Sequence, residues 1–455
     1  MNRNALIYLK KWFFDQRRKP LVMRGARQVG KTWLVRALAR ECGVALIELN
    51  FEDNPHFKDF FTTNDPKTIL LNIESYFQKT IVLEKSLLFL DEIQAMPELF
   101  AKLRWFYEGM PSLAVIAAGS LLEFMLEDYH FSVPVGRITY FYLEPLSFEE
   151  FLQAHQKEKL VAYLSQVNLR EKTPAIIHEQ LLSYFKEYIF VGGLPEVVDS
   201  WVRSRSLEKI NNTLHDILTT YRDDFSKYAR RMSIAMLDDV LNTIPNNLGK
   251  KFIYRHVHET ASIESIKKAL SVLCQARLCH RVQACHGNGL PLEAEKNHKL
   301  FKIILLDTGL VSAALHLSLH QLNGTKDINL INQGAISEQV VGQLLRTISP
   351  FYIEPRLYYW AREAVSSNAE VDYLMQYSNK IIPIEVKSGA GGSLKSLHYF
   401  MADKKFDLAV RINSETMNVT PIDLKNNTGQ PVKYQLLSIP FYLIGQIDRL
   451  LEIMF

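Results

Sequence analysis

The chain has 455 residues, of which 47% are hydrophobic, 11% aromatic and 22% charged, and its formal net charge is +4. This composition excludes a largely disordered polypeptide and supplies enough apolar residues for about two to four domains. It also excludes a membrane-spanning helix, because no window approaches about 18 apolar residues. The N-terminus lacks the apolar core of a signal peptide and no cysteine pair has zinc-site spacing, so we expect a cytoplasmic protein.

Strand-like and helix-like segments alternate through the first third of the chain. The predicted strands are Leu21–Arg24, Val44–Asn50, Ser86–Leu90, Ala114–Ala118 and Ile138–Leu143. The helical patterns between them cover Thr32–Glu41, Pro66–Phe77 and Glu98–Tyr107. Several strands are almost continuously apolar, as strands buried on both faces are. We therefore predict an α/β domain whose parallel sheet is covered by helices on both sides.

A phosphate-binding loop is predicted between the first strand and the helix that follows it. The pattern G-x-x-x-x-G-K-[ST] is fulfilled by Gly25, Ala26, Arg27, Gln28, Val29, Gly30, Lys31 and Thr32. Backbone N–H groups of such a loop face a phosphate chain, and the helix N-terminus adds positive potential. Lys31 would reach the terminal phosphates, and the Thr32 hydroxyl would hold Mg²⁺. A plain glycine-containing turn is the alternative, but the full pattern in this context predicts binding of ATP or another nucleoside triphosphate.

Two carboxylates follow the apolar run of the third predicted strand. A carboxylate at the C-terminal end of a parallel strand points into the ligand crevice, so Asp91 would bind Mg²⁺ together with Thr32. Glu92 would activate or orient the water that attacks the γ-phosphate. Two acids that merely end a strand are the alternative, which the phosphate loop upstream in the same fold disfavours.

Two further polar residues near this sheet have open interpretations. Ser120 follows the fourth strand and would sense the γ-phosphate, or it belongs to an ordinary strand-ending turn. Arg137 precedes the fifth strand and would contact the nucleotide of a neighbouring subunit as an arginine finger, or it is a surface arginine.

From residue 147 onward the pattern becomes helical. Ser147-Phe-Glu-Glu150 is typical of a capping box at the start of a helix. Farther along, a helical face around Ser262–Ala276 precedes two β-like runs, Leu278–Ala284 and Leu300–Leu305, with a glycine-containing turn between them. Helices followed by a hairpin are the outline of a winged helix.

The segment from Lys250 to Arg281, which includes the helix of this predicted winged helix, is basic. Seven basic residues and two acids, Glu259 and Glu264, give it a net charge of +5; the basic residues are Lys250, Lys251, Arg255, Lys267, Lys268, Arg277 and Arg281. Lys267 and Lys268 lie on the helix that would contact DNA phosphates. A solvated basic face without a nucleic-acid partner is the alternative.

A third group of polar residues lies on two strands near the C-terminus, Ala369–Tyr377 and Lys380–Val386, which follow a helix at Glu338–Ile348. Glu385 and Lys387 are two residues apart and share one face of a strand, and Asp372 on the paired strand can reach the same side. The two carboxylates would hold a divalent metal, and Lys387 would activate water or stabilise developing phosphate charge. Ordinary surface acids and a lysine on a hairpin are the alternative.

The arrangement of Gly25–Thr32, then Leu87–Gln94, then Gly119-Ser120 resembles the AAA+ superfamily of P-loop ATPases. The segments Phe190-Val-Gly-Gly-Leu-Pro195 and Leu306-Asp-Thr-Gly309-Leu further resemble a prokaryotic branch that carries a helical lid, a winged helix and a C-terminal domain of restriction-endonuclease type. Asp372, Glu385 and Lys387 match the PD-(D/E)XK nuclease motif, Glu338 matches an additional acid of that superfamily, and Val371 replaces the nominal proline. The resemblance implies four domains: an AAA+ core over 1–146, a lid over 147–234, a winged helix over 235–322, and an α/β nuclease-like domain over 323–455.

The leading hypothesis is a DNA-associated AAA+ ATPase whose nucleotide cycle controls the nuclease-like domain, with ATP and Mg²⁺ as cofactors. In this hypothesis the protein has no membrane partner. It forms a homo-oligomer with nucleotide at subunit interfaces if an arginine acts in trans. The alternative is an ATP-switched DNA- or protein-binding module with a catalytically silent nuclease fold. A small-molecule kinase is disfavoured, because Asp91 and Glu92 supply a water activator.

Overall fold

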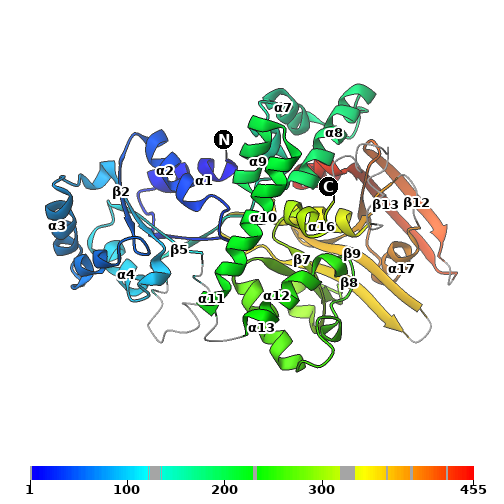
Figure 1. Ribbon diagram of the computed structural model, residues 1–455. Coiled ribbons are helices and arrows are strands. Elements are labelled where there is room, and N and C mark those ends of the chain that lie inside the picture. The colour runs from blue at the N-terminus through cyan, green and yellow to red at the C-terminus, as the bar shows by residue number, and fades with distance from the viewer. Residues whose placement is uncertain are drawn as a thin grey trace. The chain divides into compact units, whose positions relative to one another are not determined.

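The computed structural model describes residues 3–120, 122, 134, 136–228, 233–317, 334–364, 367–389, 393–426 and 429–455. The chain, drawn in Figure 1, divides into two compact units. The first unit, which we call the ATPase unit after the resemblance of its sequence motifs, comprises Met1–Glu144, Gln275–Arg277 and Ser349–Glu354. The second unit comprises Pro145–Cys274, Leu278–Ile348 and Pro355–Phe455.

A five-stranded parallel sheet forms the centre of the ATPase unit, in the order β2-β3-β4-β1-β5. Its strands are β1 (Leu21–Arg24), β2 (Ala45–Asn50), β3 (Ser86–Asp91), β4 (Ala114–Ala118) and β5 (Thr139–Tyr142). Every residue of β3 and β4 is buried, which requires cover on both faces of the sheet. The predicted parallel α/β fold is therefore confirmed, with strand ends that differ by at most one residue.

The helices of this unit agree with the apolar periodicity. They are α1 (Asn4–Phe14), α2 (Lys31–Cys42), η1 (Pro55–Phe61), α3 (Pro66–Phe77), η2 (Leu83–Lys85), η3 (Ile93–Ala95) and α4 (Leu99–Gly109). Asp65 begins α3 by accepting hydrogen bonds from the N–H groups of Lys67 and Thr68. The inward faces of η1, α3 and α4 bury aromatic and aliphatic side chains against β1, β3 and β4 in one core.

A segment from late in the sequence completes the ATPase unit. The Tyr142 backbone N–H donates to the Phe351 carbonyl at 2.7 Å, and the Phe351 ring stacks on Phe141 with centroids 5.1 Å apart. Tyr8 of α1 also contacts Phe351, at 5.8 Å between ring centroids. The edge next to β5 is thus finished by residues more than two hundred positions downstream.

The second unit begins with helices, as predicted. They are α6 (Phe148–Ala154), α7 (Glu158–Gln166), α8 (Ala175–Val191), α9 (Pro195–Ser204), α10 (Leu207–Asp223), α11 (Phe225–Tyr228), α12 (Ile234–Thr243), η4 (Pro245–Asn247), η5 (Tyr254–His256) and α13 (Ile263–Gln275). Ser147 and Glu150 form the predicted capping box: the Ser147 N–H donates to the Glu150 carboxylate at 3.0 Å, and the Glu150 N–H donates to the Ser147 hydroxyl at 3.3 Å. The chain therefore turns into α6 where the sequence pattern indicates.

An eight-stranded mixed sheet follows, in the order β12-β13-β11-β10-β9-β8-β6-β7. Its strands are β6 (Cys279–Cys285), β7 (Lys296–Leu305), β8 (Leu357–Ala364), β9 (Ser367–Tyr377), β10 (Lys380–Val386), β11 (Leu408–Asn413), β12 (Asn418–Lys425) and β13 (Pro431–Pro440). The two expected hairpins, β6–β7 and β9–β10, are both present as antiparallel pairs. Strand β6 also pairs in parallel with β8, so the hairpin expected in the winged helix and the strands expected in the nuclease-like domain belong to one sheet.

The remaining helices of this unit are η6 (Leu292–Glu295), α14 (Thr308–Ala314), α16 (Ala335–Thr347), α17 (Lys395–Lys404), η8 (Phe441–Gln446) and α18 (Ile447–Met454). Helix α17 packs against the sheet in a core that includes Leu397, Phe400, Trp360 and Leu436. None of the described helices combines the length and the apolar character needed to cross a membrane. The four cysteines are free thiols.

Buried hydrogen bonds join two glycine-containing segments of the second unit, Phe190–Pro195 and Leu306–Leu310. The Asp307 carboxylate accepts hydrogen bonds from the N–H of Gly193 at 2.6 Å and of Gly309 at 2.9 Å, and from the Gln343 amide at 2.8 Å. Gly192 has a φ of 79°, and a Cβ there would lie 1.8 Å from an Asp307 oxygen. Gly192 is therefore required by this close contact, and Gly309 is required because a Cβ there would lie 2.4 Å from the Val191 carbonyl oxygen.

Candidate functional site: a phosphate loop and a carboxylate cluster

The phosphate loop connects β1 to α2 in a backbone conformation that needs its glycines. Gly30 has a φ of 94° and precedes the first residue of α2. A Cβ on Gly25 would lie 2.6 Å from the Leu143 carbonyl oxygen, so only glycine fits there. Gln28 is also left-handed, with a φ of 64°, while Ala26 and Val29 are buried beneath the loop. Successive residues of this kind make a concave loop of backbone N–H groups.

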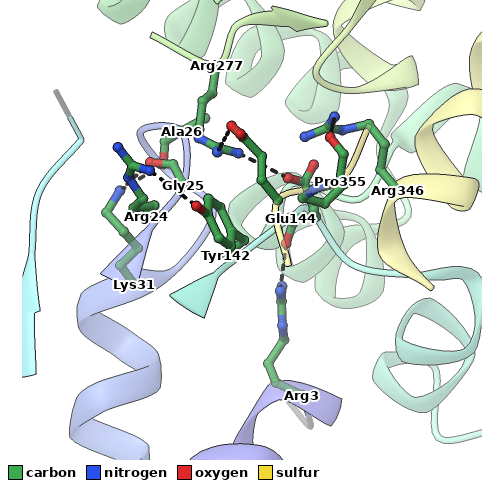
Figure 2. A network of polar contacts seen from close by, with 11 residues as sticks. Arg3, Arg24, Gly25, Ala26, Lys31, Tyr142, Glu144, Arg277, Arg346 and Pro355 are labelled. Carbon is green, nitrogen blue, oxygen red and sulfur yellow. Dashed lines mark hydrogen bonds and ion pairs between the residues drawn. The ribbon is translucent and has the colours of Figure 1, made fainter. Parts of the chain in front are cut away.

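Lys31 folds back over the loop. Its ammonium group donates to the carbonyl oxygens of Gly25 at 3.0 Å and Ala26 at 2.8 Å (Figure 2). The residue is only 7% exposed. A buried ammonium next to a phosphate-sized loop is a fixed positive charge for an anionic ligand.

Thr32 and Asp91 meet as predicted. The Thr32 hydroxyl donates to the Asp91 carboxylate at 2.9 Å, although the two residues are 59 positions apart in the sequence. Asp91 ends β3 and is 3% exposed. Burial and, secondarily, the adjacent Glu92 raise the pKa of Asp91 to about 6, and the Thr32 hydrogen bond opposes this shift. A hydroxyl beside a buried carboxylate is an oxygen donor pair that suits Mg²⁺.

Glu92 stands in a constrained turn directly after β3. Its φ of 51° is left-handed, and its carboxylate accepts a hydrogen bond from the Gln94 amide. The Gln94 side chain lies against Gly119, where a Cβ would be 2.1 Å from the Gln94 amide oxygen. Gln94 thus holds Glu92, a role that the sequence pattern alone did not assign to it.

Ser120 and Arg137 lie at opposite ends of the strands of the parallel sheet. Ser120 follows β4, the strand that lies between β1 and β3. It is buried at the C-terminal ends of the strands, as is the phosphate loop. Arg137 precedes β5, so it lies at the N-terminal ends of the strands, where its guanidinium pairs with Glu108 at 3.2 Å. Arg137 is exposed and is not brought to the nucleotide site of its own chain.

Arg277 differs from its basic neighbours in sequence. It is 4% exposed and lies 5.0 Å from the ring centroid of Tyr142. Its guanidinium pairs with Glu144 at 3.5 Å (Figure 2). It also pairs with Glu354 at 2.9 Å. The interpretation of Arg277 as part of a DNA-contacting basic face is therefore wrong, because its charge is buried against two carboxylates of the ATPase unit.

The C-terminal motif residues converge in the second unit. Asp372 on β9 accepts a hydrogen bond from the Val386 backbone N–H at 2.7 Å, which ties it to β10. Lys387 follows β10 and donates to Glu385 at 2.6 Å. Glu338 on α16 reaches the same place: ligand oxygens of Glu338, Glu370 and Asp372 all lie within 4.8 Å of one another. Helix α16 and the β9–β10 hairpin thus bring the predicted residues together.

The charges of this carboxylate cluster are strongly coupled. Burial, reinforced by the charge of Asp372, raises the pKa of Glu338 and that of Glu385 to about 8. Buried like charges of this kind favour a proton or another cation between them. The donor set is made of carboxylate oxygens, which fits Mg²⁺ or Mn²⁺.

Lys302 is a further member of the cluster that sequence reasoning missed. It lies on β7, and its ammonium group donates to Glu338 at 2.9 Å and also pairs with Glu370. In the sequence Lys302 is one of several lysines in a β-like run. The β6–β8 pairing brings β7 into the same sheet as β9, and α16 bonds directly to β7 through Gln339 and Leu305.

Residues 17–152 match the family described as AAA domain. The match covers the phosphate loop and all five strands of the parallel sheet. Residues 182–321 and 333–427 match two families that are each described as a domain of unknown function, DUF8612 and DUF4143. No curated protein matches the chain.

Two solved structures are similar to parts of the chain. A Walker-type ATPase of Pyrococcus abyssi is 16% identical, with a TM-score of 0.44, over 69% of this chain and 95% of that chain. The ORC2 protein of Aeropyrum pernix, solved as ADPNP–ADP complexes, is 14% identical, with a TM-score of 0.33, over 70% of this chain and 93% of that chain.

Proposed function

We propose that the chain is an ATP-hydrolysing, DNA-associated AAA+ protein whose nucleotide cycle controls a metal-dependent nuclease-like domain. The observation that carries the ATPase assignment is the hydrogen bond between Thr32 and Asp91 at the mouth of the phosphate loop. Both side chains are oriented before any ligand arrives, so little ordering remains to be done on binding.

Each residue at this site has a distinct task. Lys31 and the loop N–H groups hold the phosphate chain, and Thr32 and Asp91 hold Mg²⁺. Bound Mg²⁺ would neutralise charge on the phosphate oxygens. Glu92, positioned by Gln94, accepts a proton from the attacking water, and Ser120 contacts the γ-phosphate from the end of β4. Arg137 is exposed at the N-terminal ends of the strands, away from this loop, and is free to contact the nucleotide of a neighbouring subunit in a homo-oligomer.

DNA association is supported by the exposed basic residues around α13. The exposed members are Lys250, Lys251, Arg255, Lys267, Lys268 and Arg281. Lys267 lies 5.5 Å from the Tyr254 ring centroid, and Arg281 lies 5.1 Å from that of Phe301. Basic groups interleaved with aromatic rings suit a phosphate backbone.

The nuclease-like part of the proposal rests on the convergence of Asp372, Glu385, Lys387 and Glu338. Asp372 and Glu385 would hold Mg²⁺, which would stabilise charge on a scissile phosphate. Lys387 is the more accessible of the two lysines at the cluster, so it is the one that can orient water or contact the phosphate.

The second candidate function is an ATP-switched binding module with a silent nuclease fold. The specific observation in its favour is Lys302, whose ammonium already neutralises two carboxylates of the cluster. A protein of this kind would bind DNA in a nucleotide-dependent way without cutting it.

A cleavage assay distinguishes the two functions. Supercoiled, linear and single-stranded DNA would be incubated with Mg²⁺ or Mn²⁺, with and without ATP, using wild type, Lys387→Ala and the exposed-lysine control Lys299→Ala. Cleavage that Lys387→Ala abolishes and ATP modulates supports the first function. Intact ATP hydrolysis with no cleavage of any substrate supports the second.

A further inference from the structure

The ammonium group of Lys302 lies where the carboxylates would otherwise bind a cation. Among the described residues, Glu338, Glu370 and Asp372 offer oxygens mutually within 4.8 Å. Two of these three residues are already paired with Lys302, Glu338 at 2.9 Å and Glu370 in a close ion pair. A divalent ion between these same oxygens would have to displace the ammonium.

Lys302 is fixed in this place. It is 2% exposed, and its ammonium lies 5.2 Å from the ring centroid of Tyr359 on β8. Its backbone pairs with Val282 of β6 on one side and with Lys251 in an isolated bridge on the other. Withdrawing the side chain would leave Glu338 as a buried, uncompensated charge, which is strongly unfavourable. The ammonium is thus a permanent part of the cluster.

A different position in the cluster still needs a cation. Glu385 is 4% exposed; one of its oxygens pairs with Lys387 at 2.6 Å, and the other is buried without a hydrogen-bond partner among the described residues. Asp372 and Glu338 are its charged neighbours. A buried carboxylate oxygen without a donor is rare unless an ion or a water molecule satisfies it.

We propose that Lys302 acts as a built-in cation that limits the C-terminal site to one divalent metal ion, held by Asp372 and Glu385. Glu338 and Glu370 remain bound to Lys302 and are not metal ligands. Lys302 is a positioning residue in this arrangement, since it sets where the metal binds without touching a substrate. The inference rests on the proposed metal-dependent function of this domain.

The test counts Mn²⁺ ions per chain by electron paramagnetic resonance, in full-length protein without nucleotide. All samples carry Asp91→Asn, so that ions at the ATPase site do not contribute. Wild type at the C-terminal site binds one ion, and Asp372→Asn or Glu385→Gln binds none. Lys302→Met binds two, because the position held by the ammonium is freed. The matched control Lys299→Met, an exposed lysine on the same strand, binds one.

Glu370→Gln keeps the test decisive if Lys302→Met fails to fold, because it leaves Lys302 paired with Glu338. It retains one ion; loss of that ion would make Glu370 a ligand and overturn the inference. Two ions in the unaltered C-terminal site, or one ion in folded Lys302→Met, would also overturn it while leaving the metal-dependent function standing. No ion in either protein would instead overturn the metal-dependent function itself.

Discussion

Single side chains in this protein hold charge where burial makes charge costly. Lys31, Asp91, Arg277 and Lys302 are all buried, and each has a charged or strongly polar partner. Such charges persist in native structures when paired, and they concentrate at functional sites. Substitutions at these positions therefore test function more sharply than substitutions at the surface.

We expect Lys31→Ala to lower ATP turnover by on the order of a hundredfold or more, because it removes the fixed charge beside the phosphates. A phosphate-release assay at saturating Mg²⁺ and ATP measures the effect. Lys67→Ala, which removes an exposed lysine on α3, serves as the control and keeps wild-type turnover. Wild-type turnover in folded Lys31→Ala would place hydrolysis elsewhere.

Asp307 gives a pH-dependent prediction. Burial raises its pKa to about 6, above the unfolded value near 4. The folded state then binds more protons than the unfolded state between these values, so this contribution to stability is present at low pH and is lost as the pH rises through about 6. Asp307→Asn removes the titration and replaces one of the two acceptor oxygens by an NH₂ group, so either the Gly193 or the Gly309 N–H loses its acceptor.

The free energy of unfolding should therefore be lower in Asp307→Asn than in wild type, and the deficit should be about 1 kcal/mol larger at pH 5 than at pH 7.5. Urea unfolding followed by circular dichroism at both pH values measures it. Asp423→Asn, an exposed aspartate on β12, controls for surface charge. A deficit that shrinks at pH 5 would contradict the assignment.

At the scale of elements, α13 presents Lys267 and Lys268 to solvent. If both contact DNA phosphates, the double variant Lys267→Ala/Lys268→Ala should bind DNA more weakly and reduce the slope of log K against log salt by about 2. Fluorescence anisotropy across a salt series gives the slope. Lys209→Ala on α10 is the control, and an unchanged slope in the double variant would exclude α13 as the DNA-contacting helix.

The sequence predicted elements well where the local pattern determines them. β1 and α3 were predicted to the residue, because their apolar runs are bounded by polar or glycine residues. The capping box at Ser147 has the same local character. Strands β8, β11, β12 and β13 had not been identified individually, since they are defined by pairing across the eight-stranded sheet.

The same contrast holds for the site. Lys31 and Thr32 belong to one motif of fixed spacing, and Asp91 ends an apolar strand of the same parallel sheet, so their meeting could be predicted. Lys302 could not be assigned, because its partners lie on α16 and β9, far away in the sequence. Burial of Arg277 likewise depends on Glu144 and Glu354, contacts that no local pattern reveals.

At the scale of the whole molecule, Arg137 tests whether chains cooperate. We expect Arg137→Ala to lower turnover about a hundredfold or more if it stabilises transition-state charge in a neighbouring subunit. Mixing Arg137→Ala with Lys31→Ala should then restore part of the activity, because a mixed assembly pairs an intact site with an intact arginine. Arg104→Ala, which removes the other arginine bound to Glu108, is the control.

Wild-type turnover in Arg137→Ala, or no gain on mixing two inactive variants, would leave Arg137 as a surface residue. Phosphate release against the mixing ratio provides the measurement, with a maximum expected near equal amounts of the two chains.

Phe351 has a consequence for how the protein is made. The ring that stacks on Phe141 and the carbonyl that receives the Tyr142 N–H come from Ser349–Glu354, and Arg277 comes from another late segment. During synthesis the ribosome releases the phosphate loop and all five strands of its sheet long before these residues emerge. The nascent ATPase unit therefore has an unfinished edge beside β5 until these residues emerge, and a fragment cut after residue 146 would keep that edge permanently exposed.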